Sequence, residues 1–285
     1  MDNYQYIQNF QDNDGLLRSY FNYTQTVFGF DLMDWRKSGH WKDNYIPHAI
    51  VFNNQVVAGM GASKMMVQIN GSNVPAIQIG SVGVMPEYRG KGLARILMER
   101  VLEEYKDYPL IFLFASEDVS KFYTKLGYKR VQEGEPFIYI QHKGKALEAE
   151  KISLNSEHLE RLLNTKVQRS TIIDARDNLS FYWFHLMYFY EEDIYYIEEK
   201  DVIFIASYED DIVYLHDVLS SNEVTFDEIQ NYIIKKSTKQ VRFGFTPDWL
   251  CVDYQVVPRL DKHIYVIGDF IEDMSNCKFP KTSIT

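Results

Sequence analysis

The sequence predicts an α/β (α+β) protein of two domains, the first built on a mixed, mostly antiparallel sheet. Three observations support this. A chain of 285 residues with 46% hydrophobic content exceeds what one core usually organises, since cores stop growing near about 250 to 300 residues. Apolar runs joined by tight-turn residues fill positions up to 85. After them the apolar residues recur at the spacing of a helix, and a short continuous apolar run follows. We place the domains at 1–145 and 150–285.

The first elements expected are a strand at 4–10, an amphipathic helix at 12–27 and a short helix at 31–37. Two hairpins follow. Asn53-Asn54 separates two apolar runs, and Asn70-Gly71 separates two more; both pairs tolerate the positive φ angles of a tight turn. We therefore expect an antiparallel meander of four strands, at 49–52, 55–60, 64–69 and 74–85.

Beyond Pro86 the apolar period changes to that of a helix, expected at 92–107. The apolar run 110–114 is short and bounded by polar residues, which is typical of a buried strand parallel to the one before the helix. A helix at 119–126 and a strand at 129–140 complete the expected first domain.

Composition narrows the range of functions. The net charge of −10 argues against nucleic acid as a partner, because phosphate binding needs clustered Lys and Arg. No apolar stretch approaches the roughly 20 residues of a spanning helix, so we expect no membrane contact and a cytoplasmic location. Cys251 and Cys277 are too few for a disulfide framework and are expected to be buried thiols. The seven histidines lack metal-ligand spacing, so no metal is expected.

The segment from Arg89 to Ala94, Arg-Gly-Lys-Gly-Leu-Ala, carries the clearest chemistry. A helix beginning there leaves backbone N–H groups unpaired and partially positive, which suits an anion. Gly90 and Gly92 let a phosphate approach the backbone, and Arg89 and Lys91 add positive charge. The segment is therefore a candidate diphosphate site; the alternative is a glycine-rich connection with two solvated cations.

Two other phosphate loops fit less well. The P-loop pattern fails because Gly92 follows Lys91, where a hydroxyl residue is required. A dinucleotide fingerprint begins with Gly90 and Gly92, but Arg95 stands at the third glycine. Glu117 and Asp118 lie where that fold would place a ribose-binding acid, whereas the antiparallel strands upstream argue against it. A nicotinamide-dependent reductase therefore stays open as a lesser alternative.

The segment Arg89 to Ala94 resembles the pyrophosphate loop of the GNAT superfamily of N-acetyltransferases, Gln/Arg-x-x-Gly-x-Gly/Ala. Phe122-Tyr123-Thr124-Lys125-Leu126-Gly127-Tyr128 resembles a second motif of that family, at the right separation. The resemblance covers residues 4 to 140. More narrowly, the stretch 28–45 and the sequence of 78–84 resemble two-domain bacterial members related to the enhanced-intracellular-survival acetyltransferases.

This resemblance implies a GNAT fold with splayed central parallel strands, and acetyl-CoA (coenzyme A) as co-substrate. It implies that Tyr123 protonates the departing thiolate. Pantetheine would pair with the backbone at Val82 and Val84. The pyrophosphate would lie on the loop formed by Arg89, Gly90, Lys91, Gly92, Leu93 and Ala94. Ser116 and Phe122 would also contact the cofactor. Ser116 stands where the family often has Asn.

No general base can be assigned from the sequence. Gln78 and Ser81 on the expected strands are not basic, which leaves a water relay or a carboxylate such as Glu117 or Asp118.

The second domain repeats part of the first pattern. The aromatic run 181–190 is too short to cross a bilayer and should be a buried element. A hairpin at 202–208 and 212–219, a helix at 226–236 with a Thr225/Glu228 capping box, and a strand at 240–245 follow. This order suggests a smaller α/β domain, a degenerate GNAT-like repeat. Its strand-to-helix link, 220–224, has an acid and no glycine, so it should not bind coenzyme A.

The function expected is transfer of an acetyl group from acetyl-CoA to a primary amine by direct attack in a ternary complex. Residues 151–285 hold 23 acidic and 14 basic residues, against 17 and 16 in residues 1–150, so the second domain would favour a cationic small-molecule acceptor in the pocket it helps to form. A non-catalytic acyl-CoA-binding or sensing module is the alternative. The oligomeric state is open, a homodimer included.

Overall fold

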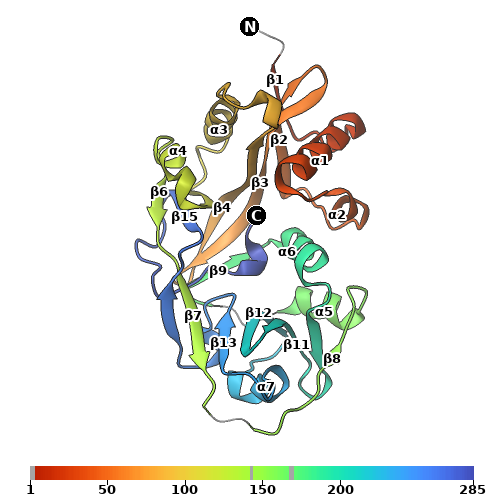
Figure 1. Cartoon of the computed structure of the whole chain (residues 1–285), viewed down its shortest axis with the longest axis vertical. Helices are drawn as coiled ribbons and strands as arrows, with labels where there is room; N and C mark the ends of the chain where they lie inside the picture. Colours follow the sequence, from red (N-terminus) through yellow and green to blue (C-terminus); the bar gives the residue numbers. More distant parts are fainter. Residues whose placement is uncertain (1–3, 142–143, 167–169) are drawn as a thin grey trace.

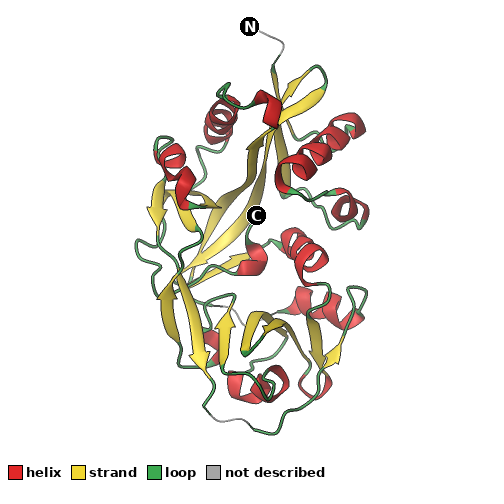
Figure 2. Cartoon of the chain, in the orientation of Figure 1, coloured by secondary structure: helices red, strands yellow, loops and turns green. Residues whose placement is uncertain are grey.

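The computed structural model describes residues 4–141, 144–166 and 170–285. It contains two sheets at opposite ends of an elongated molecule, and the chain ends between them at Thr285 (Figure 1). Helices flank both sheets (Figure 2). The α/β prediction with a mixed, mostly antiparallel first sheet is confirmed.

The first sheet has eight strands in the order β1-β2-β3-β4-β5-β15-β6, with β9 added to β3. The strands of this sheet are β1 (Gln5–Gln8), β2 (Tyr45–Phe52), β3 (Gln55–Ile69), β4 (Ser72–Val84), β5 (Leu110–Ala115), β6 (Lys129–Val131), β9 (Ile173–Arg176) and β15 (His263–Gly268).

Both predicted hairpin turns are present. Asn53 and Asn54 have φ values of 50° and 62°, and Asn70 and Gly71 have 47° and 81°, so each pair occupies the left-handed region. The predicted break at 61–63 is absent, because β3 runs unbroken to Ile69 and pairs with β4 along most of its length. The predicted parallel pairing of β4 and β5 is confirmed.

The helices of the first part lie over this sheet: α1 (Asp14–Phe28), α2 (Met33–Lys37), α3 (Leu93–Glu104) and α4 (Ser120–Thr124). The Asn13 side chain accepts from the Leu16 N–H and so caps α1. On α3 the buried residues are Leu93, Leu97, Met98 and Val101, whereas Ile96 is 47% exposed. The predicted helix 119–126 is a 3₁₀ turn, Glu117–Val119, followed by the short α4.

The second sheet has seven strands in the order β14-β7-β13-β12-β11-β10-β8. They are β7 (Gly134–Tyr139), β8 (Glu150–Lys151), β10 (Ile194–Ile197), β11 (Val202–Glu209), β12 (Ile212–Ser220), β13 (Gln240–Phe243) and β14 (Gln255–Pro258). The helix α7 (Phe226–Ile233) connects β12 to the parallel β13, as α3 connects β4 to β5. The predicted capping box of Thr225 and Glu228 is present.

The aromatic run forms α6 (Leu179–His185) and a π-helical turn (Leu186–Tyr190), and most of it is buried as predicted. The remaining helix, α5 (Glu157–Thr165), buries Leu159, Leu162 and Leu163. Cys277 is buried, but Cys251 is exposed, so that half of the cysteine prediction is wrong.

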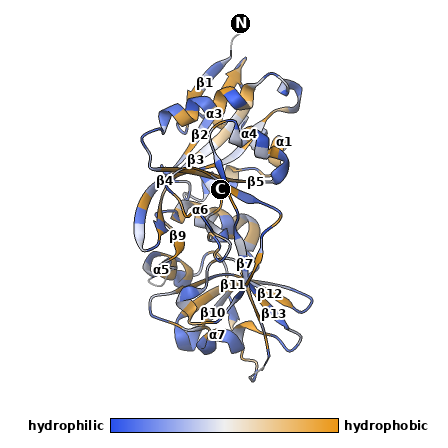
Figure 3. Ribbon diagram, turned by 90° about the vertical axis from the view of Figure 1, so that its left-hand side faces the viewer, coloured by the Kyte–Doolittle hydropathy of each residue, from blue (hydrophilic) through white to orange (hydrophobic). Residues whose placement is uncertain are grey.

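Strands cross between the two parts of the chain. The predicted strand 129–140 is wrong as one element: β6 pairs in the first sheet and β7 in the second, with Glu133 between them. Conversely, two strands from the later part of the chain join the first sheet: β9 pairs with β3, and β15 pairs with β5. The apolar residues of β9 and β15 indicate burial but not the sheet in which each strand pairs, so the sequence did not predict this exchange. Figure 3 shows the two sheet regions from the side, with the end of the chain between them.

Candidate active site

The parallel strands β4 and β5 separate part of the way along. They pair from Ala76↔Leu110 to Ile79↔Leu113. Beyond that point β4 stays with β3 through a register shift at Gly59/Gly61, where Ser81 has a φ of 53°, while β5 continues beside β15. The backbone of the last β4 residues therefore lacks a strand partner on the β5 side, as the splayed arrangement requires.

The connection from β4 to α3 leaves free backbone donors at the open end of this gap. Gly90 and Gly92 have φ values of 77° and 76°, which a residue with a side chain rarely adopts. The first amide with an intrahelical acceptor is that of Ile96, bonded to the Gly92 carbonyl over 3.1 Å. Within the described residues, no acceptor is found for the amides of 90–95, so they form a cluster of donors with the positive end of the helix dipole behind them.

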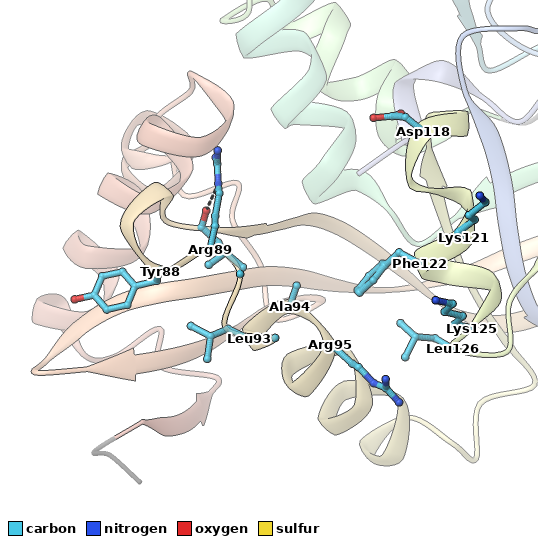
Figure 4. A pocket seen from close by; sticks show the side chains of 13 residues that line it. Tyr88, Arg89, Leu93, Ala94, Arg95, Asp118, Lys121, Phe122, Lys125 and Leu126 are labelled. Carbon is cyan, nitrogen blue, oxygen red and sulfur yellow. Dashed lines mark hydrogen bonds between the residues drawn. The ribbon is translucent and has the colours of Figure 1, made fainter.

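Except for Lys91, the residues of 89–95 line a cavity of about 610 Å³ between the start of α3 and α4 (Figure 4). Four cationic side chains line it, Arg89, Arg95, Lys121 and Lys125, with Asp118 as the single carboxylate of the lining. The floor is apolar, formed by Val84, Leu93, Phe122 and Leu126. A cavity with a positive rim, bare amides and an apolar floor suits an anionic ligand that also carries an uncharged portion.

The structure brings most of the predicted cofactor-binding residues together. Seven line the cavity: Val84, Arg89, Gly90, Gly92, Leu93, Ala94 and Phe122. Three do not. Val82 packs against the core of the first sheet, Lys91 holds its Nζ 4.7 Å from the Tyr88 ring centroid, and the Ser116 hydroxyl donates to Asp118.

Tyr123, the predicted catalytic residue, lies on α4 and is 7% exposed. Its neighbour Phe122 lines the cavity, whereas Tyr123 does not. The Tyr123 ring packs against Phe122, Tyr128 and Tyr265, with centroids 5.1, 5.8 and 5.4 Å away. Burial, and after it the neighbouring Tyr265, raises the pKa of Tyr123 to about 12. The hydroxyls of Tyr128 and Tyr265 are buried and have no partner among the described residues.

Tyr265 is a site residue that sequence reasoning missed. It belongs to β15, more than a hundred positions after Tyr123, and only the strand exchange brings the two rings together. No short motif surrounds it that could have signalled this role.

The candidate bases differ in their surroundings. Glu117 is engaged by Arg130 at 3.2 Å and by His263 at 3.3 Å, whereas Asp118 lines the cavity and accepts from Ser116. The Glu117 carboxylate, which takes part in both pairs, is largely exposed to solvent. Gln78 is fully buried, and its side chain bonds the backbone of Ser283 and Thr285 instead of facing open space.

The last residues of the chain lie against β4 close to the splay. A Cβ on Gly80 would meet Thr285 Oγ1 at 2.6 Å and its carbonyl carbon at 2.7 Å, so only glycine permits this approach. Sequence reasoning missed Thr285 as well, because proximity of position 285 to position 80 has no local signal.

One described histidine has a clearly structural environment. His48 is fully buried between the hydroxyls of Tyr6 (2.7 Å) and Tyr105 (3.0 Å). Among residues 4–141, 144–166 and 170–285, no group of three or more His, Cys, Asp or Glu side chains is placed to hold a metal ion. In the same ranges no helix is long and apolar enough to cross a membrane.

Comparison with solved structures gives the same fold over most of the chain. A probable N-acyltransferase from Enterococcus faecalis, described as a conserved protein of unknown function, matches with a TM-score of 0.64 and 15% identity, over 92% of this chain and 71% of its own. A GCN5-related N-acetyltransferase from Kribbella flavida gives 0.59 and 16%, over 92% and 71%. Eis1 from Mycobacterium abscessus gives 0.60 and 14%, over 92% and 73%.

No curated protein sequence matches the chain. Residues 9–131, however, match the sequence profile of the acetyltransferase (GNAT) domain. This range spans the meander, the splay and the whole loop from Arg89 to Ala94, and it ends at the last residue of β6. Residues 9–131 therefore match an acetyltransferase (GNAT) domain, and this match supports an acyltransferase.

Proposed function

We propose that the protein transfers an acetyl group from acetyl-CoA to a primary amine of a small molecule, by direct attack in a ternary complex. The observation that carries this proposal is the cluster of free amides at 90–95, facing a positively lined cavity at the end of the splay. Donors of this kind hold phosphate oxygens.

The residues present fit the chemical parts of coenzyme A. Arg89, Gly90, Gly92 and Ala94 would hold the diphosphate through backbone N–H groups and charge, and the apolar floor at Val84 and Phe122 suits the uncharged arm. When bound, acetyl-CoA supplies the thioester that an amine attacks. Val82 and Lys91 would contact it through their backbone groups, because their side chains pack elsewhere. The Ser116 hydroxyl would first have to leave Asp118.

Tyr123 would act as a hydrogen-bond donor to the departing sulfur. A phenol whose pKa is about 12 is fully protonated near neutral pH, so it always has a proton to offer. Complete transfer to a thiolate is uphill, since the conjugate acid of a thiolate has a pKa of about 8.5. We therefore assign Tyr123 the stabilisation of developing negative charge on sulfur.

We propose a cationic acceptor, because residues 151–285 hold 23 acidic residues against 14 basic. Rates of acetyl transfer would be compared for polyamines, aminoglycosides, neutral amines and acidic amino acids. Higher kcat/KM for the cationic amines, shrinking as salt is added, is the expected result; equal or higher values for acidic amines would remove this part of the proposal.

Binding and turnover together test the function. A ligand at about 100 times its dissociation constant stabilises the native state by about 2.7 kcal/mol, so acetyl-CoA should raise the melting temperature. Stabilisation by NADPH but not by acetyl-CoA would favour a reductase instead. Binding of acetyl-CoA without release of free thiol across the amine panel would favour a non-catalytic sensing module.

A further inference from the structure

A second cavity, of about 140 Å³, lies on the C-terminal sheet and shares no lining residue with the first. Side chains alternate between the faces of a strand, so Tyr214 and Arg242 point away from the core that Val213, Leu215 and Val241 form with α7. The cavity lies on that polar face. Residues of β7, β12 and β13 line it together with four from the last part of the chain, Arg259, Asp261, Lys278 and Lys281.

Cationic side chains outnumber carboxylates in this cavity. Its lining includes Arg242, Arg259, Lys278 and Lys281, against Glu135 and Asp261. Arg259 and Lys278 are 8% and 7% exposed, so two of the cations are held in the interior. Buried cations need fixed negative partners or a bound anion.

The two carboxylates are already engaged. Asp261 accepts from Arg259 at 2.8 Å, and Glu135 accepts from Lys278 at 3.2 Å. Arg259 has a further partner, Glu133, at 2.7 Å. These pairs account for two of the four cations of the lining.

Arg242 and Lys281 lack such partners. The Arg242 Nε donates to the neutral Gln240 side chain at 2.9 Å, and Lys281 Nζ lies 6.0 Å from the Tyr190 ring centroid. In the part of the chain that the structure describes, neither has a carboxylate within ion-pair distance. Each therefore retains N–H donors for a ligand.

Neighbouring groups respond to this surplus of positive charge. Burial, and then Lys281 and Lys278, lower the pKa of His216 to about 3. The pKa of Lys281 is lowered too, first because protein surrounds part of its side chain although the residue reaches solvent, and then by the charges of Lys278 and Arg259. A positive cavity is the more notable because residues 151–285 carry 23 acidic and only 14 basic residues.

We propose that this cavity binds a tetrahedral oxyanion, phosphate or sulfate, with Arg242 and Lys281 as the donors that are not otherwise paired. A water occupies roughly 30 Å³ in the liquid, so about 140 Å³ accommodates an anion of five heavy atoms. Lys281 is exposed and Arg242 half-buried, so the anion can enter from solvent.

Occupation of this site would also fix the end of the chain. The Lys281 N–H donates to the Gly244 carbonyl at 2.7 Å, and four residues later Thr285 packs against Gly80 of β4. An anion held between Arg242 and Lys281 therefore ties this segment to the second sheet, while its end contacts the first.

Isothermal titration of inorganic phosphate into the full chain tests the proposal. The double variant R242Q/K281Q should bind phosphate at least tenfold more weakly than the wild type, because it loses two charge-assisted donors. R18Q/K64Q removes the same charges from exposed positions of the first part and should change the affinity by less than about twofold. Acetate, which is planar, should bind more weakly than phosphate.

A third variant separates the two cavities. R89Q/R95Q alters the loop and the first turn of α3, so it should weaken acetyl-CoA and any phosphate bound there, while the phosphate binding that R242Q/K281Q removes should persist. Equal phosphate affinity in the wild type and R242Q/K281Q, or loss in R89Q/R95Q alone, overturns the proposal without touching the acetyltransferase assignment. Absence of saturable phosphate and sulfate binding by the wild type overturns it as well.

A direct measurement covers the case in which R242Q/K281Q fails to fold. Crystals of the wild type soaked in selenate should give an anomalous peak between Arg242 and Lys281. A peak only at Gly90 to Arg95, or none, would contradict the site.

Discussion

Arg259 Nη1 lies 2.7 Å from Glu133 Oε2, and this ion pair is buried where the chain passes from one sheet to the other. Glu133 separates β6 of the first sheet from β7 of the second, and Arg259 follows β14. The Glu133 carboxylate also accepts from the Phe279 N–H at 2.6 Å, and the Glu133 carbonyl accepts from the Arg259 N–H at 2.9 Å. One side chain thus holds three segments that cross between the sheets.

The variant E133Q should be strongly destabilised. Removing one partner of a buried pair typically costs about 3 to 5 kcal/mol. Here the exposed Asp261 would remain as the only carboxylate paired with Arg259 among the described residues, so the cost should fall towards the lower end. The free energy of unfolding from urea titration would measure this. E99Q breaks the exposed pair of Arg95 and Glu99 and should cost less than about 1 kcal/mol. Similar values for both variants would show that the Glu133 pair does not hold the sheets together.

This region also shows what the sequence could and could not predict. The hairpins at Asn53-Asn54 and Asn70-Gly71, the loop at Gly90 and Gly92, and the capping box of Thr225 were predictable because local backbone chemistry determines them. The split of strand 129–140 at Glu133 was not, because the polar stretch 132–135 does not indicate which sheet each half of the strand joins.

The residues of the candidate site likewise fall into those that the sequence could predict and those that it could not. The residues of the loop follow one another in sequence, so a motif could find them, and most of them line one cavity. Tyr265 beneath Tyr123 and Thr285 beside Gly80 reach the site through long-range strand pairing and the path of the chain end. Nothing at those positions distinguishes them from core residues.

The variant Y123F tests the role proposed for the phenol. Loss of a hydrogen bond to developing charge should lower kcat by about 10- to 100-fold while leaving the dissociation constant of acetyl-CoA within about threefold. Y128F removes a neighbouring buried hydroxyl that has no partner among the described residues, and it should leave kcat nearly unchanged. Equal effects of the two variants would assign Tyr123 a packing role only.

Stability should fall on mild acidification, in part through His48. Burial lowers the pKa of His48 to about 4, whereas an unfolded histidine has a pKa of about 6.5. The unfolded chain therefore binds this proton first, so the stability is full above pH 6.5 and declines as the pH falls towards 4, by about 3 kcal/mol for this residue.

The variant H48Q isolates that contribution, because Gln can bond to both Tyr6 and Tyr105 without titrating. Between pH 6 and 4.5, its free energy of unfolding should depend on pH less steeply than that of the wild type, by up to one proton or about 1.4 kcal/mol per pH unit. Parallel curves for the two proteins would mean that His48 is protonated in the native state.

The most direct test of the account is calorimetric titration of acetyl-CoA into the wild type, G90E and G90Q. Both variants place a side chain at a φ of 77°, so they share the same backbone strain, but only G90E puts a negative charge among the amides of 90–95. The account predicts saturable binding by the wild type, weaker binding by G90Q, and a further loss of at least tenfold in G90E. Binding by G90E as tight as that of G90Q, or none by the wild type, would contradict it.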